Sequence, residues 1–232
     1  RYGYEMLPVI DASNRLLGII TVDDVIDIIE EEQTEDVQKT VGAGAGEAVY
    51  SGIGEKLKGR MPWLIVSAVM MLPATYIVLG FELMIEKVAL LAVFMPLIAA
   101  LAGNAGHQAL AVTLRGIVLD EVRPDRIFPL MRRELTVGLV TGVIIGSAVA
   151  VILWIFGDGE LATRLGIIFA CAMVVSMGVG TFTGAAIPLV MKRIGADPAQ
   201  ASAIFLIMIT DAVAFSTLLG FAWIAFQWMQ GN

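Results

Sequence analysis

The chain has 232 residues, of which 58% are hydrophobic and only 16% charged, and its formal net charge is −7. A soluble domain is about 45–50% apolar and about 25% charged, so this composition excludes an ordinary soluble globular protein. Residues 1–60 hold twelve acids against six Lys/Arg, which argues against a nucleic-acid partner because such a partner needs a basic face. The single cysteine, Cys171, excludes an intrachain disulfide, and no catalytic motif indicates an enzyme.

The N-terminal segment predicts a small α/β unit. Two short apolar runs, LPVI at 7–10 and LLGII at 16–20, flank the turn-forming DASN at 11–14, which predicts a β-hairpin. Thr21 is a good N-cap for a helix over residues 22–32, whose first turn is acidic. This unit is too small to bury a core of its own, so we expect it to be the end of a larger cytosolic domain.

A glycine-rich stretch at 41–56 is interpreted as a linker. After it come apolar runs of about twenty residues, the length that crosses a bilayer core as a helix. The fold class we expect is an all-α membrane protein with a small N-terminal α/β segment. The five predicted spans lie at about 62–81, 88–115, 133–156, 165–191 and 201–228.

Basic residues in the short connecting loops predict the orientation, since Lys and Arg concentrate on the cytosolic side. They fall at alternate loops, which places the N-terminus in the cytosol and the C-terminus outside a plasma (inner) membrane. The loops at 82–87 and 157–164, which are poorer in Lys and Arg, face outward. The cytosolic set comprises Lys56, Lys58, Arg60, Arg115, Arg123, Arg126, Arg132, Arg133, Lys192 and Arg193.

The second predicted span carries helix-weakening and polar residues at membrane depth. Pro96 is followed by LIAALAGNAGHQ, which contains Gly103, Asn104 and His107. Proline removes a helix hydrogen bond and glycine relaxes the backbone, so we expect a broken span that lines an ion pathway. The alternative is a packed kink whose amides bond a neighbouring helix.

Asp211 is the single acid within the last apolar span, with roughly a dozen mostly apolar residues on either side. A carboxylate at the bilayer centre costs about 2.5–3.5 kcal/mol or more and normally faces a pathway or a bundle interior. A permeating cation would supply the missing charge, and Thr210 would add either an oxygen ligand or a helix–helix bond. The alternatives are a protonated Asp211 bonded to a carbonyl, or a proton-relay residue.

Two further patterns have a structural and a functional interpretation. His107, the single histidine, is either a soft-metal or pH-sensitive group or a residue that bonds across helices. Small residues repeat at four-residue spacing, which is typical of close helix packing or of a dimer contact. The repeated positions are Gly138, Gly142 and Gly146, and then Gly180 and Gly184.

Three stretches together resemble the MgtE family of magnesium channels. The first, LPVIDASNRLLGIITVDDVIDIIEEEQTEDV, is similar to the end of a CBS domain that leads into a connecting plug helix. The second, PLIAALAGNAGHQALAVTLRG, is similar to the family's Pro-to-Gly-Asn-x-Gly-x-Gln element, and the third, DPAQASAIFLIMITDA, to its Asp-Pro-Ala loop and pore helix. The resemblance implies a CBS remnant at 1–32, a connecting helix and linker at 33–60 and a pore domain at 61–232.

The resemblance also implies function: a homodimer in the bilayer with one pore between protomers, for passive uptake of Mg2+ gated by cytosolic Mg2+. It implies that Asp211 holds a hydrated ion and that backbone groups near Gly103 and Asn104 help line the filter, with Thr210 and Ala203 beside them. A Na+- or H+-coupled carrier of divalent cations is the alternative, and a membrane sensor without flux is a weaker one. The implied Mg2+-sensing acids are Asp23, Asp24, Glu31, Glu32, Glu35, Asp36 and Asp197.

Three positions depart from the family pattern. Ala102 stands where the first of two glycines is usual, and Ala203 with Ile204 stands where a small or amide residue and a proline are usual. His107 fills a position usually taken by a small or amide residue. Selectivity among Mg2+, Mn2+, Co2+, Ni2+ and Zn2+ is therefore the property that the resemblance leaves open.

Overall fold

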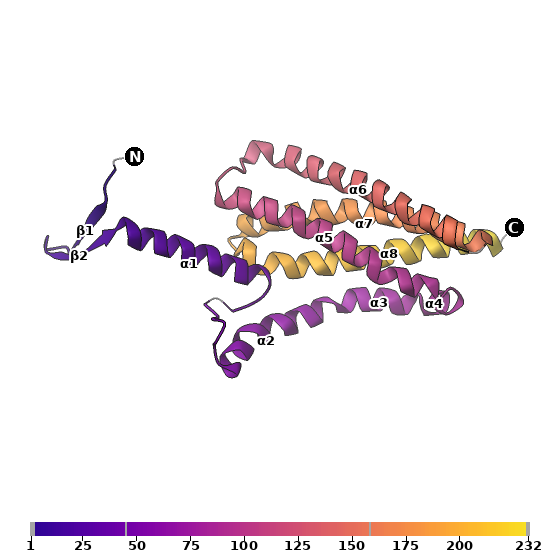
Figure 1. The fold of residues 1–232 in the computed structure, drawn as a ribbon, viewed down its shortest axis with the longest axis horizontal. Helices are drawn as coiled ribbons and strands as arrows, with labels where there is room; N and C mark the ends of the chain where they lie inside the picture. Colours follow the sequence, from indigo (N-terminus) through magenta and orange to yellow (C-terminus); the bar gives the residue numbers. More distant parts are fainter. Residues whose placement is uncertain (1–2, 45, 158, 231–232) are drawn as a thin grey trace. The chain divides into compact units, whose positions relative to one another are not determined.

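The computed structural model describes residues 3–44, 46–157 and 159–230. The chain divides between Met61 and Pro62 into two compact units. Figure 1 shows the hairpin and first helix of one unit and the long helices of the other.

The first unit begins with the predicted hairpin. Strands β1 (Met6–Ile10) and β2 (Leu16–Thr21) pair antiparallel, and helix α1 (Val22–Thr40) follows directly. Thr21 is the N-cap, as predicted, and it forms a capping box with Asp24. Helix α1 continues without interruption past residue 32, so the predicted domain end and the connecting segment share one helix.

The helices that follow confirm the all-α membrane class. In the described part of the chain, five are long and apolar enough to cross a membrane: Ile53–Gly80, Leu90–Val118, Pro124–Phe156, Gly159–Ile194 and Ser202–Trp228. Their elements are α2 (Ile53–Met70), α3 (Leu72–Gly80), α4 (Glu82–Lys87), α5 (Leu90–Val118), the short helix η1 (Pro124–Arg126), α6 (Ile127–Phe156), α7 (Gly159–Ile194) and α8 (Pro198–Gln230).

The first span differs from the prediction in two ways. Helix α2 begins at Ile53, inside the stretch interpreted as linker, and the span divides at Met71 into α2 and α3. Pro73 explains the division, because it lies in the first turn of α3 and has no N–H to continue the ladder of α2.

The predicted break in the second span is wrong: α5 is one helix of 29 residues with Pro96 inside it. Pro96 lies in the second turn, where it removes only the bond to the carbonyl of residue 92. The glycines that suggested unwinding serve close packing instead. A Cβ on Gly106 would lie 2.8 Å from Leu206 Cδ1 and 2.9 Å from the Gly180 oxygen, so only glycine fits between α5, α7 and α8.

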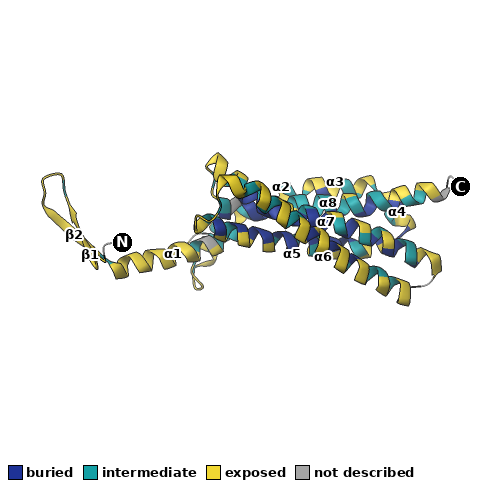
Figure 2. Cartoon of the chain, turned by 90° about the horizontal axis from the view of Figure 1, so that it is seen from above, coloured by how far each residue is buried: buried dark blue, intermediate teal, exposed yellow. Residues whose placement is uncertain are grey.

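Helix α7 is the centre of the second unit and packs against α5, α6 and α8. The core lies between these helices and is darkest in Figure 2 along α5, α7 and α8. Its largest fully buried side chains include Leu91, Ile98, Phe169, Met173 and Leu218. The outward faces are apolar and exposed, as lipid-facing surfaces are.

Candidate functional site

Helices α5 and α8 meet closely at Gly103 and Thr210. A Cβ added to Gly103 would lie 3.8 Å from the Thr210 hydroxyl. Thr210 is only 1% exposed, and its hydroxyl donates to the carbonyls of Leu206 at 2.9 Å and Ile207 at 3.1 Å. The hydroxyl therefore satisfies itself on its own helix, and this geometry favours packing over ion contact for Thr210.

Asp211 follows Thr210 on α8 and is half-buried. It lies inside the span Ser202–Trp228, and its carboxylate has no hydrogen bond or ion pair among the described residues. An ionised carboxylate at this depth needs a compensating charge or hydrogen-bond donors. The described residues provide neither, so the compensation has to come from water, a cation or another protein surface.

A polar strip runs along one exposed face of α5. Asn104 and Gln108 are exposed and four residues apart, so they lie on the same face, one turn from each other. The same face continues to Arg115 at the end of the helix. Lipid chains cannot hydrogen-bond amides, so this strip requires water or a protein partner.

The carbonyl of Gly103 is already engaged. The ring Nδ1 of His107 lies 2.8 Å from it, and since a carbonyl only accepts, Nδ1 must be the protonated nitrogen. In the neutral ring Nε2 then keeps its lone pair. The oxygen available near this point is thus the amide side chain of Asn104, whereas the resemblance implied backbone groups of Gly103 and Asn104.

Two expected site residues lie toward the start of α8. Ala203 is buried with Leu110, Ile187 and Leu206. Asp197 is exposed just before the helix, and its Oδ1 accepts a hydrogen bond of 2.9 Å from the Ala199 N–H. The structure therefore places Ala203 in a packed cluster and Asp197 at a helix start, apart from the α5–α8 contact at Gly103.

Asp23 and Asp24 lie in the first turn of α1. Asp24 accepts from the Thr21 N–H at 2.8 Å and from the Thr21 hydroxyl at 2.7 Å. These two bonds hold the pKa of Asp24 below its usual value. Asp24 thus has a clear capping role in α1, whether or not it also meets an ion.

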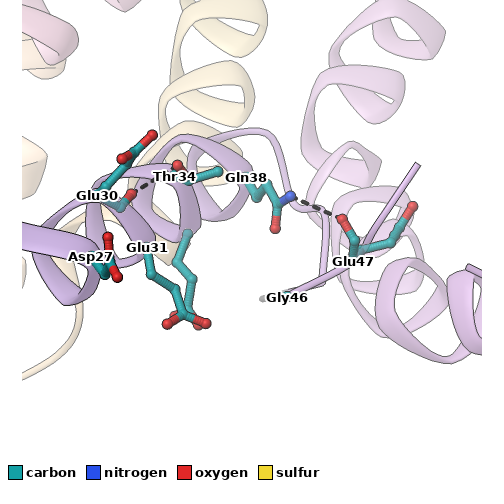
Figure 3. A pocket seen from close by; sticks show the side chains of 8 residues that line it. Asp27, Glu30, Glu31, Thr34, Gln38, Gly46 and Glu47 are labelled. Carbon is teal, nitrogen blue, oxygen red and sulfur yellow. Dashed lines mark hydrogen bonds between the residues drawn. The ribbon is translucent and has the colours of Figure 1, made fainter. Parts of the chain in front are cut away.

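An acidic pocket of about 370 Å³ lies beside α1 in the first unit. Figure 3 shows Asp27 and Glu31 on the helix, with Gln38 donating to the Glu47 carbonyl. Asp27 and Glu30 were not predicted, although Asp27 precedes Glu30 by three residues and Glu31 by four, a spacing that indicates a shared helix face. The pocket is lined by Asp27, Glu30, Glu31, Thr34, Glu35, Gln38, Gly46 and Glu47.

Not every carboxylate of this pocket is available to a cation. Arg60 pairs with Glu47 and holds its pKa below the usual value, and Lys39 lies 3.3 Å from Glu35. Among the described residues no group of three His, Cys, Asp or Glu is arranged to hold a metal directly. Glu32 is exposed outside the pocket, and the side chain of Asp36 lies outside the described residues.

Fold and site together define a multi-pass membrane protein with an exposed amide strip on α5 and, in a membrane-spanning helix, a half-buried carboxylate that has no partner in the described part of the chain. The family model for divalent cation transporters, MgtE, matches residues 95–221, which contain both α5 from Met95 onward and Asp211. The chain belongs to the MgtE family.

Three curated relatives carry the name magnesium transporter MgtE. The protein of Enterococcus faecalis is 32% identical over 90% of this chain and 46% of its own length. That of Bacillus subtilis is 31% identical over 96% and 49%, and that of Thermus thermophilus is 28% identical over 95% and 49%. The chain spans about half the length of these relatives.

Proposed function

We propose that this chain is the conducting part of a Mg2+ channel for passive, voltage-driven uptake. Two observations carry the proposal: Asp211 on α8 is half-buried with no hydrogen bond or ion pair among the described residues, and α5 has an exposed amide strip. Each polar residue comes one position after the Gly103–Thr210 contact, Asn104 on α5 and Asp211 on α8. The names of the relatives support Mg2+ as the ion.

The chemistry suits a hydrated ion. Mg2+ sheds its water reluctantly and is commonly held by one or two carboxylates and several waters. Asp211 supplies the charge, and Asn104 supplies an amide that hydrogen-bonds the waters. An inside-negative potential favours entry of a divalent ion by about 4.6 kcal/mol per 100 mV, so uptake needs no other energy source.

The same strip supports a homodimer. Asn104 and Gln108 are exposed in one chain, and a second copy around a twofold axis would enclose both strips and two Asp211 carboxylates around one water-filled path. The loop charges support a cytosolic N-terminus and an external C-terminus in the plasma membrane.

Regulation by cytosolic Mg2+ is supported by the acidic pocket on α1. Asp27, Glu30 and Glu31 have no ion-pair partner among the described residues, and divalent ions would screen their repulsion. Neutralising the three together is expected to shift the Mg2+ dependence of flux, whereas Glu5→Gln is not. Asp197→Asn tests the expected sensor residue before α8 in the same assay, and an unchanged Mg2+ dependence there would remove it from the proposal.

The test of conduction is Mg2+ flux into liposomes. Asp211→Asn and Asp211→Ala are expected to abolish most of the flux, while Glu134→Gln, at a half-buried acid of α6, leaves it within about twofold of the unmodified chain. Undiminished flux in both Asp211 variants would refute the site.

The alternative is a divalent cation carrier coupled to Na+ or H+. A channel predicts flux that follows the membrane potential and ignores Na+ and H+ gradients. Clamping the liposome potential with valinomycin and imposing each gradient in turn separates the two mechanisms.

A further inference from the structure

A pocket of about 300 Å³ lies where the end of α5 turns into the start of α6. Its lining residues do not include Asn104, Gln108 or Asp211, the polar residues of the proposed ion path. Its wall is mostly apolar, with Val112, Val122, Pro129 and Leu130, and its charged lining residues are Glu121, Arg126 and Arg133.

The charges of this pocket suit a phosphate with an amine beside it. Arg126 ends η1 and is the N-cap of α6, and Arg133 lies seven residues later, about two helical turns, so the two lie on one face. Arg133 and Glu121 have no ion pair among the described residues, and Arg126 has only an exposed contact of 3.7 Å to Asp125. Helix α6 also begins at this connection without a side-chain cap, and the positive end of its dipole favours an anion there.

The pocket offers both a polar and an apolar surface, which suits an amphiphilic ligand. On the polar side, Thr113 lines the pocket and is 2% exposed, and its hydroxyl has no hydrogen-bond partner among the described residues. A second hollow of about 590 Å³ shares Arg133 and continues along α6 past Val137 and Val140. Its two threonine hydroxyls donate to their own helix, Thr136 to the Arg132 carbonyl and Thr141 to the Val137 carbonyl, so the surface that remains is apolar.

We propose that this pocket binds a phosphatidylethanolamine molecule of the cytosolic leaflet. The phosphate lies on Arg126 and Arg133, the ammonium group on Glu121, and an acyl chain follows the hollow along α6. Basic pockets between membrane helices on the cytosolic side are known headgroup sites, and bidentate arginine–phosphate bonds are strong. The assignment to the cytosolic leaflet depends on the membrane orientation proposed above, whereas lipid binding by the pocket does not.

Native mass spectrometry of the delipidated chain tests the proposal. The chain is titrated with phosphatidylethanolamine, phosphatidylglycerol and inorganic phosphate. Phosphatidylethanolamine is expected to bind best, and the double variant Arg126→Gln/Arg133→Gln to bind it at least about tenfold more weakly, as the loss of charged hydrogen bonds predicts. Arg123→Gln is the control: it removes one positive charge from the same connection, at a residue that does not line the pocket, whereas the double variant removes two that do.

The amine contact, the arginine site and the acyl contact can each be tested separately. Glu121→Gln is expected to abolish the preference for phosphatidylethanolamine over phosphatidylglycerol. Equal binding of the two lipids by the unmodified chain overturns the amine contact, and equal loss in Arg123→Gln and the double variant overturns the site. Inorganic phosphate binding as well as the lipid overturns the acyl contact. Asp211→Asn retains lipid binding, so failure of the channel proposal is distinguishable.

Discussion

Two helix contacts in this bundle, α6 with α7 and α5 with α8, are built from similar small residues but differ in whether the neighbouring polar groups are hydrogen-bonded. Along α6, Gly138, Gly142 and Gly146 are all buried against α7, and the nearby Thr181 hydroxyl is satisfied by the Glu134 carbonyl at 2.8 Å. The α6–α7 contact therefore leaves neither of these features to explain: its glycines are packed and its threonine hydroxyl is hydrogen-bonded.

The α5–α8 contact also places a glycine beside a small side chain, Gly103 beside Thr210, although a Cβ on Gly103 would lie an ordinary 3.8 Å from the Thr210 hydroxyl. Next to it, however, the Asp211 carboxylate and the Asn104 amide have no hydrogen-bond partner among the described residues. A small-residue pattern therefore indicates only that two helices approach closely. Polar side chains without partners next to the contact distinguish the candidate ion path between α5 and α8 from the packing seam between α6 and α7.

The largest expected effect is on the packing seam. A Cβ at Gly142 would lie 2.7 Å from the Val174 Cα, a backbone atom that cannot move alone. Gly142→Ala is therefore expected to destabilise the bundle by about 1–3 kcal/mol, measured as thermal unfolding in detergent. Gly220→Ala is the control, because nothing lies within 4 Å of its Cβ position and alanine is the better helix former. Equal unfolding temperatures for the two variants would contradict the contact.

A smaller effect is expected when His107, near the α5–α8 contact, is replaced: a change in how strongly Ni2+ blocks Mg2+ flux. The lone pair on Nε2 of His107 suits borderline metals such as Ni2+ and Zn2+ better than Mg2+. His107→Asn is expected to weaken Ni2+ block of Mg2+ flux roughly tenfold, with Mg2+ flux itself retained. Val93→Leu, an exposed apolar position on the same helix, serves as the control. Identical Ni2+ block in His107→Asn and the unmodified chain would exclude the imidazole.

The smallest effect lies outside the bundle, at the start of α1. Hydrogen bonds from Thr21 lower the pKa of Asp24 below its usual value of 3.8 in the folded helix. The stabilisation is complete above that usual value and is lost as the pH falls through the lower folded-state pKa. The protection factors of the first-turn amides, which are exchange rates corrected for the intrinsic pH dependence of the chemistry, should therefore fall in acid, and Asp24→Asn should remove this loss of protection. Thr21→Ala is expected to cost about 1 kcal/mol at neutral pH, and an unaltered pH profile in Asp24→Asn would contradict the capping box.

Local signals in the sequence predicted much of the fold. The turn DASN, the N-cap Thr21 and the long apolar runs each act within a few residues, and the structure confirms the hairpin, the cap and the membrane class. The break in α5 was predicted wrongly, because the packing of Gly106 against Leu206 and Gly180 comes from two distant helices. Asp211 stood out by its charge, whereas the inward position of Thr210 depends on the crossing of α5 and α8.

The central claim is that Asn104 and Asp211 face a water-filled cation path. Asn104→Cys, made with Cys171→Ala because Cys171 is exposed, is treated in liposomes with a positively charged thiol reagent that cannot cross lipid. The account predicts rapid labelling, slowed by Mg2+ as long as Asp211 is present, and little labelling of the control Val93→Cys. Labelling of Asn104→Cys that is no faster than that control, or that ignores Mg2+, would contradict the account.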